Sequence, residues 1–539
     1  MSRDHVRVQY KLTRLAAKIQ IFDFHPISKI LEAMSLPSEA LAVPATQSNV
    51  ATRHRKAETV TPVAPENARV SLWWKSEALA LVWRQVDLSN ALQVLAPLEK
   101  KGRFYVFTRN IYLDDWERFN VFYSRHVRKL TASPDKKYEP SVGHMIASTR
   151  PSFNIFPYLD TLAFETNFHL VPLFAHQNVN EMSFVIESLS KCAEVSATLP
   201  YIAPKVPCLK HLSITTNYDS SLEALIIDMV KELKQLQSLK LPSQWLTPDV
   251  TNAVALLPQL STLETLQSAR LCKSHHPEQA EEIFSLDLPQ NCFPLLRSLT
   301  LRATIPRTKA SLPQLKKLRT ITLLPSQATS LYELLPLFTL IPQQFPCLTS
   351  LTLDFRDASG LTSARKPIPP SDLRPLFALS SLHTLHIDHT FPIQLSNDKL
   401  LGLVKKFPRL IHLSLCPHAG HKLEPTLDIT VLRSLITRRP NMKYLGLHMR
   451  VPTDHGALQV DDPTVFKSTK SLSTLCIGTS PLTDKPFPVA VYLSRILPES
   501  CRLVGPETLG PLQDMFTTLI QVRKQEQSQA RNGGRLSLA

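Results

Sequence analysis

Residues 345–353 read FPCLTSLTL, in which a proline is followed by leucines at positions 348, 351 and 353. The same L-x-x-L-x-L spacing, usually with a proline in front, returns about every thirty residues. Copies with the proline are FPYLDTLAF (156–164), VPCLKHLSI (206–214), FPLLRSLTL (293–301), FPRLIHLSL (407–415) and RPNMKYLGL (439–447). Copies without it are LQSLKL (236–241), LRTITL (318–323), LHTLHI (382–387) and LSTLCI (472–477). An internal repeat of this length predicts an array of similar structural units.

Each unit combines a strand pattern with a helix pattern. Its last two apolar residues alternate with polar ones, which indicates a strand with one buried face. Amphipathic helical patterns lie between copies, at 221–234, 397–406 and 428–437, and the recurring proline then prevents the helix from continuing. One strand and one helix cannot bury their apolar faces alone. Stacked units are therefore predicted, with a parallel sheet on the concave side and helices on the convex side.

The repeats resemble the leucine-rich repeat family over roughly 159–480. That family carries an asparagine three residues after the last leucine, and here only Asn217 completes the pattern. The corresponding positions elsewhere hold Thr304, Arg356, Thr390 and His418. The resemblance implies an α/β solenoid, a leucine-rich repeat horseshoe, made irregular by the missing asparagines and long units. The alternative is that the leucines form the core of an unrelated α/β domain.

Composition argues against several classes of enzyme. Only 12 of the 539 residues are glycine, whereas 43 are proline. Phosphate-cradling loops need glycine where the backbone approaches a phosphate closely, and no G-x-G-x-x-G, G-x-x-x-x-G-K or G-x-S-x-G string is present. No nucleophile with its base is identifiable. We therefore expect no enzymatic activity and no cofactor.

The charge and the cysteines indicate a protein of the cytoplasm or nucleus. The net charge of +16 is spread over the chain, with +9 in residues 1–150 and +7 in the rest. A nucleic-acid-binding module concentrates its charge into a patch or stripe, so this class is not favoured. The eight cysteines form no C-x-x-C pair, which indicates reduced thiols. No membrane-spanning run is present; a mitochondrial presequence at the basic N-terminus is the alternative localisation.

Two patterns precede the repeats. Ile27, Ile30 and Leu31 share one face of a predicted helix. Residues 68–88 carry Trp73, Trp74 and Trp83. The polar, proline-containing stretch 35–67 separates the two patterns and is predicted to be a disordered loop.

This pair of patterns resembles the F-box of fungal F-box-like proteins, and residues 114–130 resemble the connecting segment of that group. The resemblance implies that Ile27, Ile30 and Leu31 dock on the Skp-type linker subunit of a cullin ubiquitin ligase. Trp73, Trp74 and Trp83 would hold the module together or share that surface. A typical F-box is compact, whereas here residues 35–67 separate its two patterns. Either these residues form an inserted loop, or the middle helix of the module is lost. Alternatively, these aromatic residues form the N-terminal cap that a repeat array requires.

The predicted domain organisation has six parts. They are a basic extension (1–26), a degenerate F-box-like module (27–90), a connecting helical segment or cap (91–156), the repeats (157–505), a capping helix (506–526) and a disordered tail (527–539).

Polar residues that flank the repeat leucines are the candidate protein-binding positions, because they point away from the core. They are His211, Arg302, Asp354, His386, Asp388, His412, Tyr444 and His448. Two groups were weighed as metal ligands. His383, His386 and His389 would not converge on one ion from a strand, and Cys416, His418 and His421 lack a fourth ligand. No metal site is predicted.

The sequence thus favours an adaptor in which the repeats capture a target protein on the concave face and the N-terminal module tethers it to an SCF-type ligase. The alternative is an interaction scaffold whose F-box has decayed. A basic nucleic-acid-binding protein is the third hypothesis, and only the net charge motivates it.

Overall fold

The computed structural model describes residues 79–536, apart from 187–191, 217, 267–291, 303–307, 310–314, 316, 325–330, 357–367, 421–423, 452–457, 459–470, 482–485 and 507–508. The chain divides into two compact units, Met1–Leu162 and Ala163–Ala539. Five of the six predicted linker-binding residues (Ile27, Ile30, Leu31, Trp73 and Trp74) lie outside the described residues. The extension 1–26 and the polar stretch 35–67 lie outside them as well.

The described part of the first unit mixes helices and strands. Its helices are α4 (Leu88–Leu95), α5 (Leu113–Phe122) and α6 (Pro140–Thr149). Strand β1 (Gln85–Asp87) pairs in parallel with β4 (Lys129–Ala132), and β2 (Leu98–Lys101) forms a hairpin with β3 (Phe104–Phe107). The helical segment predicted at 91–156 therefore also contains strands. The hairpin escaped prediction because LEKK at 98–101 has no apolar alternation.

The second unit is built on one parallel sheet whose strands follow each other in chain order. After β5 (Thr161–Phe164), which crosses the unit boundary, the strands are β6 (Glu181–Ile186), β7 (His211–Thr216), β8 (Ser238–Pro242), β9 (Thr262–Leu266), β10 (Ser298–Leu301), β11 (Thr320–Leu323), β12 (Ser350–Asp354), β13 (Thr384–Asp388), β14 (His412–Leu415), β16 (Tyr444–Leu447), β18 (Thr474–Cys476) and β19 (Arg502–Val504). The repeated leucine strings and these strands coincide, so the predicted α/β solenoid is confirmed.

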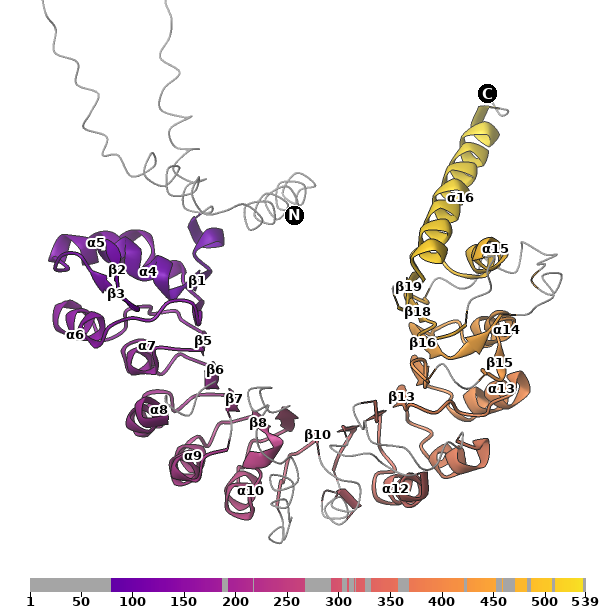
Figure 1. Ribbon diagram of the computed structural model, residues 1–539, viewed down its shortest axis with the longest axis horizontal. Coiled ribbons are helices and arrows are strands. Elements are labelled where there is room, and N and C mark those ends of the chain that lie inside the picture. Colours follow the sequence, from indigo (N-terminus) through magenta and orange to yellow (C-terminus); the bar gives the residue numbers. More distant parts are fainter. Residues whose placement is uncertain are drawn as a thin grey trace, which may run out of the picture. The chain divides into compact units, whose positions relative to one another are not determined.

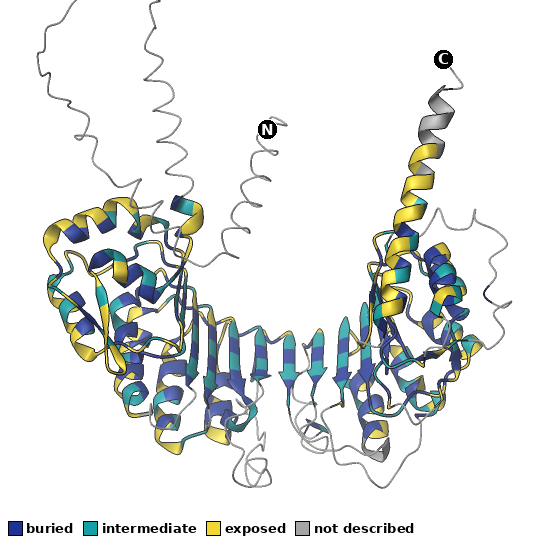
Figure 2. Cartoon of the chain, turned by 45° about the horizontal axis from the view of Figure 1, so that its top comes forward, coloured by how far each residue is buried: buried dark blue, intermediate teal, exposed yellow. Residues whose placement is uncertain are grey.

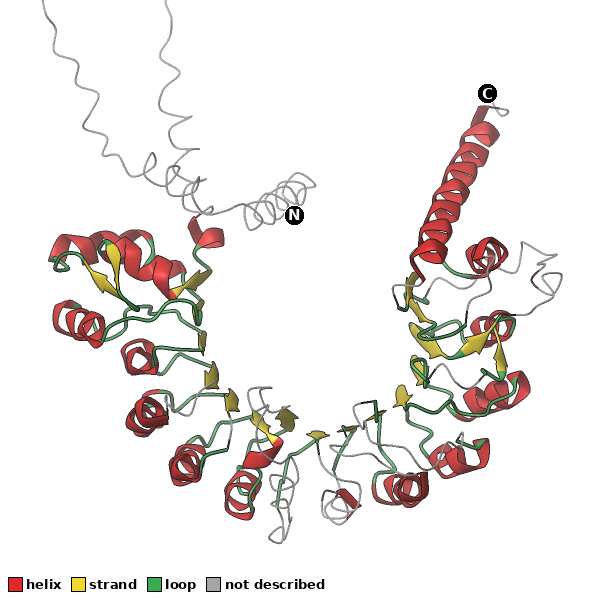
Figure 3. Cartoon of the chain, viewed as in Figure 1, coloured by secondary structure: helices red, strands yellow, loops and turns green. Residues whose placement is uncertain are grey.

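Helices cover the outer side of this sheet, and the strands line its inner side (Figures 1 and 3). The helices of the unit are α7 (Val171–Phe174), α8 (Cys192–Thr198), α9 (Ser220–Glu232), α10 (Pro248–Ala255), α12 (Leu331–Gln344), α13 (Asn397–Lys406), α14 (Val431–Arg438), α15 (Pro486–Ile496) and α16 (Gly510–Leu536). Side-chain oxygens of Asp219, Thr247 and Ser396 cap α9, α10 and α13. Such caps satisfy backbone N–H groups that a helix leaves unpaired at its start.

The repeat leucines form the core between sheet and helices. Phe345, Leu348, Leu351 and Leu353 are each at most 1% exposed. Burying one such side chain contributes roughly 1.5–3 kcal/mol. Figure 2 shows the resulting alternation of buried and half-buried positions along the strands.

Backbone hydrogen bonds join successive units at the start of each strand. The Arg319 carbonyl accepts from the N–H groups of Thr349 and Ser350, at 2.8 and 3.0 Å. The Thr349 carbonyl in turn accepts from His383 and Thr384, at 2.7 and 3.1 Å. Each unit is therefore aligned with the next at the start of its strand.

The last helix differs from its predicted extent. Leu512, Phe516 and Ile520 of α16 are buried, as a capping helix requires. The helix continues past residue 526 to Leu536, through much of the tail predicted to be disordered. None of the helices in the described ranges has the length and apolar character needed to span a membrane.

Candidate functional site

The predicted protein-binding residues fall into two groups along the second unit. One group consists of His211, which is exposed on β7, and Arg302, which directly follows β10. The backbone N–H of Arg302 donates to Oγ1 of Thr265 at 2.5 Å. The other six lie on or directly after β12, β13, β14 and β16, and they are Asp354, His386, Asp388, His412, Tyr444 and His448. The second half of the sheet therefore holds most of the candidate site.

Strand register aligns four of these six residues in two pairs. Asp354 pairs with Asp388, and His412 pairs with Tyr444, whose ring lies 6.5 Å away between centroids. His386 pairs with Ser414 on the next strand. Parallel pairing places residues of equal repeat position about 4.8 Å apart. His412 and Tyr444 therefore form one row at the start of their strands, and Asp354 and Asp388 form another row at the ends of theirs.

Arg356 links the two aspartates of this row. Its Nε and a terminal nitrogen lie 2.9 and 2.6 Å from the two carboxylate oxygens of Asp354. The same Nε lies 3.3 Å from Oδ2 of Asp388, and that oxygen also lies 2.8 Å from Nδ1 of His418. A guanidinium that contacts two carboxylates has little freedom to move, so the network is preorganised.

The residues of the candidate site differ in how far they are buried. Asp388 is 0% exposed and His448 is 5% exposed, whereas Asp354, His386, His412 and Tyr444 are half-buried. Arg356 and His418 bond to the Asp388 carboxylate, whose Oδ1 has no hydrogen-bond partner among the described residues. Asp388 therefore orients its neighbours, while the half-buried residues are available for contact.

The network also sets protonation states. Burial would raise the pKa of Asp354, but the side-chain and backbone hydrogen bonds of Arg356 outweigh it and lower that pKa. Hydrogen bonds to Asp388 and then to Cys476 raise the pKa of His418 to about 9. Burial lowers the pKa of His386 and of His412. At neutral pH the face thus combines anionic, cationic and neutral groups.

Three residues of the site were not among the predicted ones, namely Arg356, His418 and Cys476. Arg356 and His418 occupy the position where the leucine-rich repeat family carries asparagine. That substitution is the sequence signal that could have identified them. Cys476 has no comparable signal, because it sits inside the leucine string LSTLCI.

In the first unit, Trp83 is the one predicted linker-binding residue that the structure describes. It is 4% exposed and packs against Tyr123, with ring centroids 4.5 Å apart and ring planes tilted by 47°. Its neighbour Val82 is 42% exposed, and Phe122, next to Tyr123, is 40% exposed. Trp83 therefore packs inside the unit, while apolar residues beside the two rings face solvent.

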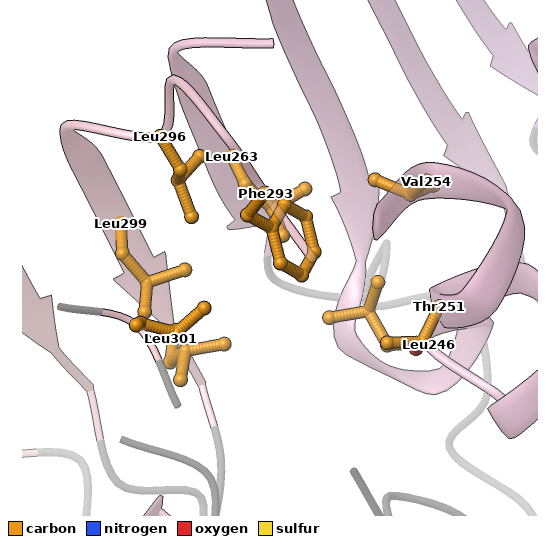
Figure 4. Close-up of a pocket in the computed structure, with 9 residues that line it drawn as sticks. Leu246, Thr251, Val254, Leu263, Phe293, Leu296, Leu299 and Leu301 are labelled. Atoms are coloured by element: carbon orange, nitrogen blue, oxygen red, sulfur yellow. The ribbon is translucent and has the colours of Figure 1, made fainter. Parts of the chain in front are cut away.

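The apolar cavity in Figure 4 belongs to the core of the repeats. It lies among α10 and strands β9 and β10, and its lining residues are Leu246, Thr251, Val254, Leu263, Phe293, Leu296, Leu299, Leu301 and Leu315. Thr251 is the single polar residue of that lining. Nothing in the lining is charged, so the cavity is not a candidate for polar chemistry.

Comparison with known proteins found only distant structural similarity. No family model matches the sequence, and no curated protein matches it. A chain in the crystal structure of the TLR13–ssRNA13 complex is 15% identical with a TM-score of 0.31, and the match covers 72% of this chain and 60% of that one. A chain in the complex of Rad7 and Elc1 from yeast is 14% identical with a TM-score of 0.25, with 82% and 96% covered. Similarity at this level carries no information on function.

The fold and its polar inner face together define the class of the molecule. It is an α/β solenoid of the leucine-rich repeat type, with two groups of polar side chains on β12, β13, β14 and β16 and in the turns that follow them.

Proposed function

We propose that this protein is a non-catalytic interaction protein that binds a partner protein on the concave face of its repeats. The supporting observations are the preorganised network of Arg356 with Asp354 and Asp388, and the neighbouring half-buried rings of His412 and Tyr444. Arginine and tyrosine are enriched at the energetic centres of protein interfaces. An arginine already fixed by two carboxylates loses little side-chain entropy when a partner binds.

Paired variants of the full-length chain test this proposal. His412→Ala combined with Tyr444→Ala removes two half-buried rings from the concave face. Lys405→Ala combined with Lys406→Ala removes two exposed lysines from α13 on the outer side and serves as the control. Partners identified by quantitative cross-linking mass spectrometry should be lost with the first variant and retained with the second. Equal partner sets for both variants would contradict a concave binding face.

The finer proposal is that the N-terminal module tethers the captured protein to a cullin ubiquitin ligase through a Skp-type linker subunit. Support comes from the F-box-like sequence pattern and from the exposed apolar residues Val82 and Phe122 beside the packed rings of Trp83 and Tyr123. The protein would then act by proximity, raising the local concentration of its target near the ligase. The alternative is a scaffold with a decayed F-box.

Binding of the full-length chain to a purified linker subunit separates these two functions. Ile30→Asp, and Val82→Asp combined with Phe122→Asp, should each weaken binding at least tenfold, since a charge replaces an apolar contact. Phe153→Asp is the control, because Phe153 is 84% exposed in the same unit. If the unaltered chain does not bind the linker while concave partners are retained, the scaffold function replaces the ligase role.

The place of action would be the cytoplasm or the nucleus. The cysteines of the described residues, including the exposed Cys347, are all free thiols, which supports a reducing compartment.

A further inference from the structure

The segment 149–158, which leads from the end of α6 toward β5, is fixed along α5 in the first unit (Figure 1). Nε1 of Trp116 in α5 donates to Oγ1 of Thr149 at 3.1 Å. Further on, the buried ring of Phe156 lies 5.6 Å between centroids from the ring of Phe119, which also belongs to α5. These two anchors give the segment a defined course over the surface of the unit.

Two aromatic rings of this segment face solvent. Phe153 is 84% exposed and Tyr158 is 58% exposed. Each ring has a guanidinium over it: Arg150 lies 5.1 Å from the centroid of Phe153, and Arg128 lies 4.8 Å from that of Tyr158. Four contacts between a cation and an aromatic ring fall within residues 105–158, whereas a stretch of this length ordinarily contains about one.

The arginines of this surface carry uncompensated charge. A terminal nitrogen of Arg128 donates to the carbonyl of Arg125 at 2.9 Å, so these two residues are neighbours in space. Neither of them, nor Arg150, has an ion-pair partner within the ranges that the structure describes. Asp160 is the nearby acidic residue, and its backbone N–H donates to the carbonyl of Arg128 at 2.8 Å. Three cations beside one carboxylate give the surface a net positive charge, although the charge of the whole chain is spread out.

We propose that Arg125, Arg128, Arg150, Phe153 and Tyr158 form a binding surface for single-stranded RNA. Unpaired bases stack on aromatic rings and on guanidinium planes, and arginines contact the phosphates between those bases. A duplex keeps its bases stacked inside and presents no open base faces, so a single strand is the class that fits. RNA is the abundant single strand in the cytoplasm and the nucleus, where we propose that this protein acts.

The exposed rings favour RNA over an acidic peptide. Carboxylates of a peptide would pair with the arginines, but they would leave the two rings open to water. A base is flat and largely apolar on its faces, so it covers ring surface that is otherwise exposed. The combination of Phe153 and Tyr158 with unpaired arginines therefore matches a ligand that alternates flat rings with negative charges.

Fluorescence anisotropy of a labelled oligouridylate of about 12 nucleotides measures binding to the purified full-length chain. Phe153→Ala combined with Tyr158→Ala should weaken binding at least about tenfold, since two stacking surfaces are lost. The matched control is Tyr201→Ala combined with Phe487→Ala, because these rings are 63% and 57% exposed in the second unit. The control should bind RNA as tightly as the unaltered chain does.

The dependence of binding on salt tests the arginines. Each phosphate contact with a single strand contributes about 0.7 to the slope of log Kd against log salt concentration. Arg128→Gln combined with Arg150→Gln should therefore reduce that slope by about 1.4. Lys405→Gln combined with Lys406→Gln removes the same charge from α13 and should leave the slope unchanged.

Ultraviolet cross-linking of the unaltered chain in cells identifies the nucleic acid that it contacts. Cross-linked material that ribonuclease removes supports the proposal, whereas material that only deoxyribonuclease removes overturns it. The proposal is also overturned if the unaltered chain does not bind the oligouridylate, or if the ring variant and its control bind equally. Equal affinity for a duplex RNA or for a polyglutamate peptide would overturn it as well, since neither offers unpaired bases. None of these measurements requires a partner protein, so the result is independent of the proposed function.

Discussion

Nδ1 of His418 lies 2.8 Å from Oδ2 of Asp388, although 30 residues separate them in the chain. Asp388 ends strand β13, and His418 stands in the turn after the neighbouring strand. The contact is the largest cause that raises the pKa of His418 to about 9. It also connects His418, through the Asp388 carboxylate, with the ion pairs of Arg356.

The first prediction concerns alkaline pH. Because the pKa of His418 is raised in the folded chain, its contribution to stability is complete below pH 6.5 and is lost as pH rises toward 9. Burial would raise the pKa of Cys476, but hydrogen bonds outweigh it and lower that pKa, which acts on stability in the opposite direction. Cys476→Ser is therefore the background in which to measure the effect of His418. In that background the melting temperature should fall between pH 6.5 and 9. Adding His418→Gln should reduce this dependence of the melting temperature on pH. An equal dependence in both chains would show that the pKa of His418 is not raised in the folded chain.

The second prediction concerns acid. His389 is 1% exposed, and burial lowers its pKa to about 4. The unfolded chain binds this proton near pH 6.5 and the folded chain does not, so stability falls as pH drops from 6.5 to 4. The loss from this residue is at most about 3 kcal/mol.

Urea denaturation at pH 7 and pH 4.5 measures this loss. The matched variant is His389→Asn, whose amide oxygen can accept the Phe391 N–H that Nδ1 of His389 accepts at 2.9 Å. The variant should lose less stability over this range than the unaltered chain. An identical loss would show that His389 does not titrate as described.

The third prediction concerns Gly478, which has a φ of +45° in the turn after β18 and lies against Pro417 in the turn after β14. Gly478→Ala should reduce the free energy of unfolding by at least about 2 kcal/mol, since it adds backbone strain and a clash with Pro417. Gly402→Ala is the control: nothing lies within 4 Å of a Cβ built at this position of α13. Alanine there should stabilise the helix by roughly 0.5–1 kcal/mol. Urea denaturation of both variants should therefore give changes of opposite sign.

The fourth prediction concerns the repeated leucines. Leu351 is 0% exposed, and Leu351→Ala should cost about 2–5 kcal/mol through lost burial and a residual cavity. Leu335 on α12 is 36% exposed, so Leu335→Ala should cost much less. Similar losses in thermal or chemical unfolding would mean that the leucine string is not the core.

Much of the repeat fold could be predicted because its cause is local. In LHTLHI, the leucines and the isoleucine occupy the buried side of β13, and the residues between them face the other side. The hairpin of β2 and β3 could not be predicted in the same way. LEKK has no alternating pattern, and its pairing with FYVF depends on a turn at Gly102, where φ is +61°.

The candidate site was predictable only in part. Alternation identifies Asp354, His386 and Tyr444 as residues of one face. The alternation does not identify Arg356, because Arg356 lies beyond the end of the strand. It also does not predict that Asp388, which contacts Arg356, is buried. These outcomes depend on which residue of one unit lies beside which residue of the next, and the length of the intervening loops decides that register.

The sequence by itself determined the repeated strand-and-helix unit, the parallel sheet and the apolar core, because periodic leucines can be buried only by stacking. Only the tertiary structure decided that Arg356, Asp388 and His418 meet. Their contacts depend on how the neighbouring strands and the turns after them are aligned. Hydrophobic burial is non-directional and follows from pattern, whereas hydrogen bonds between distant residues require positions fixed to within a fraction of an ångström.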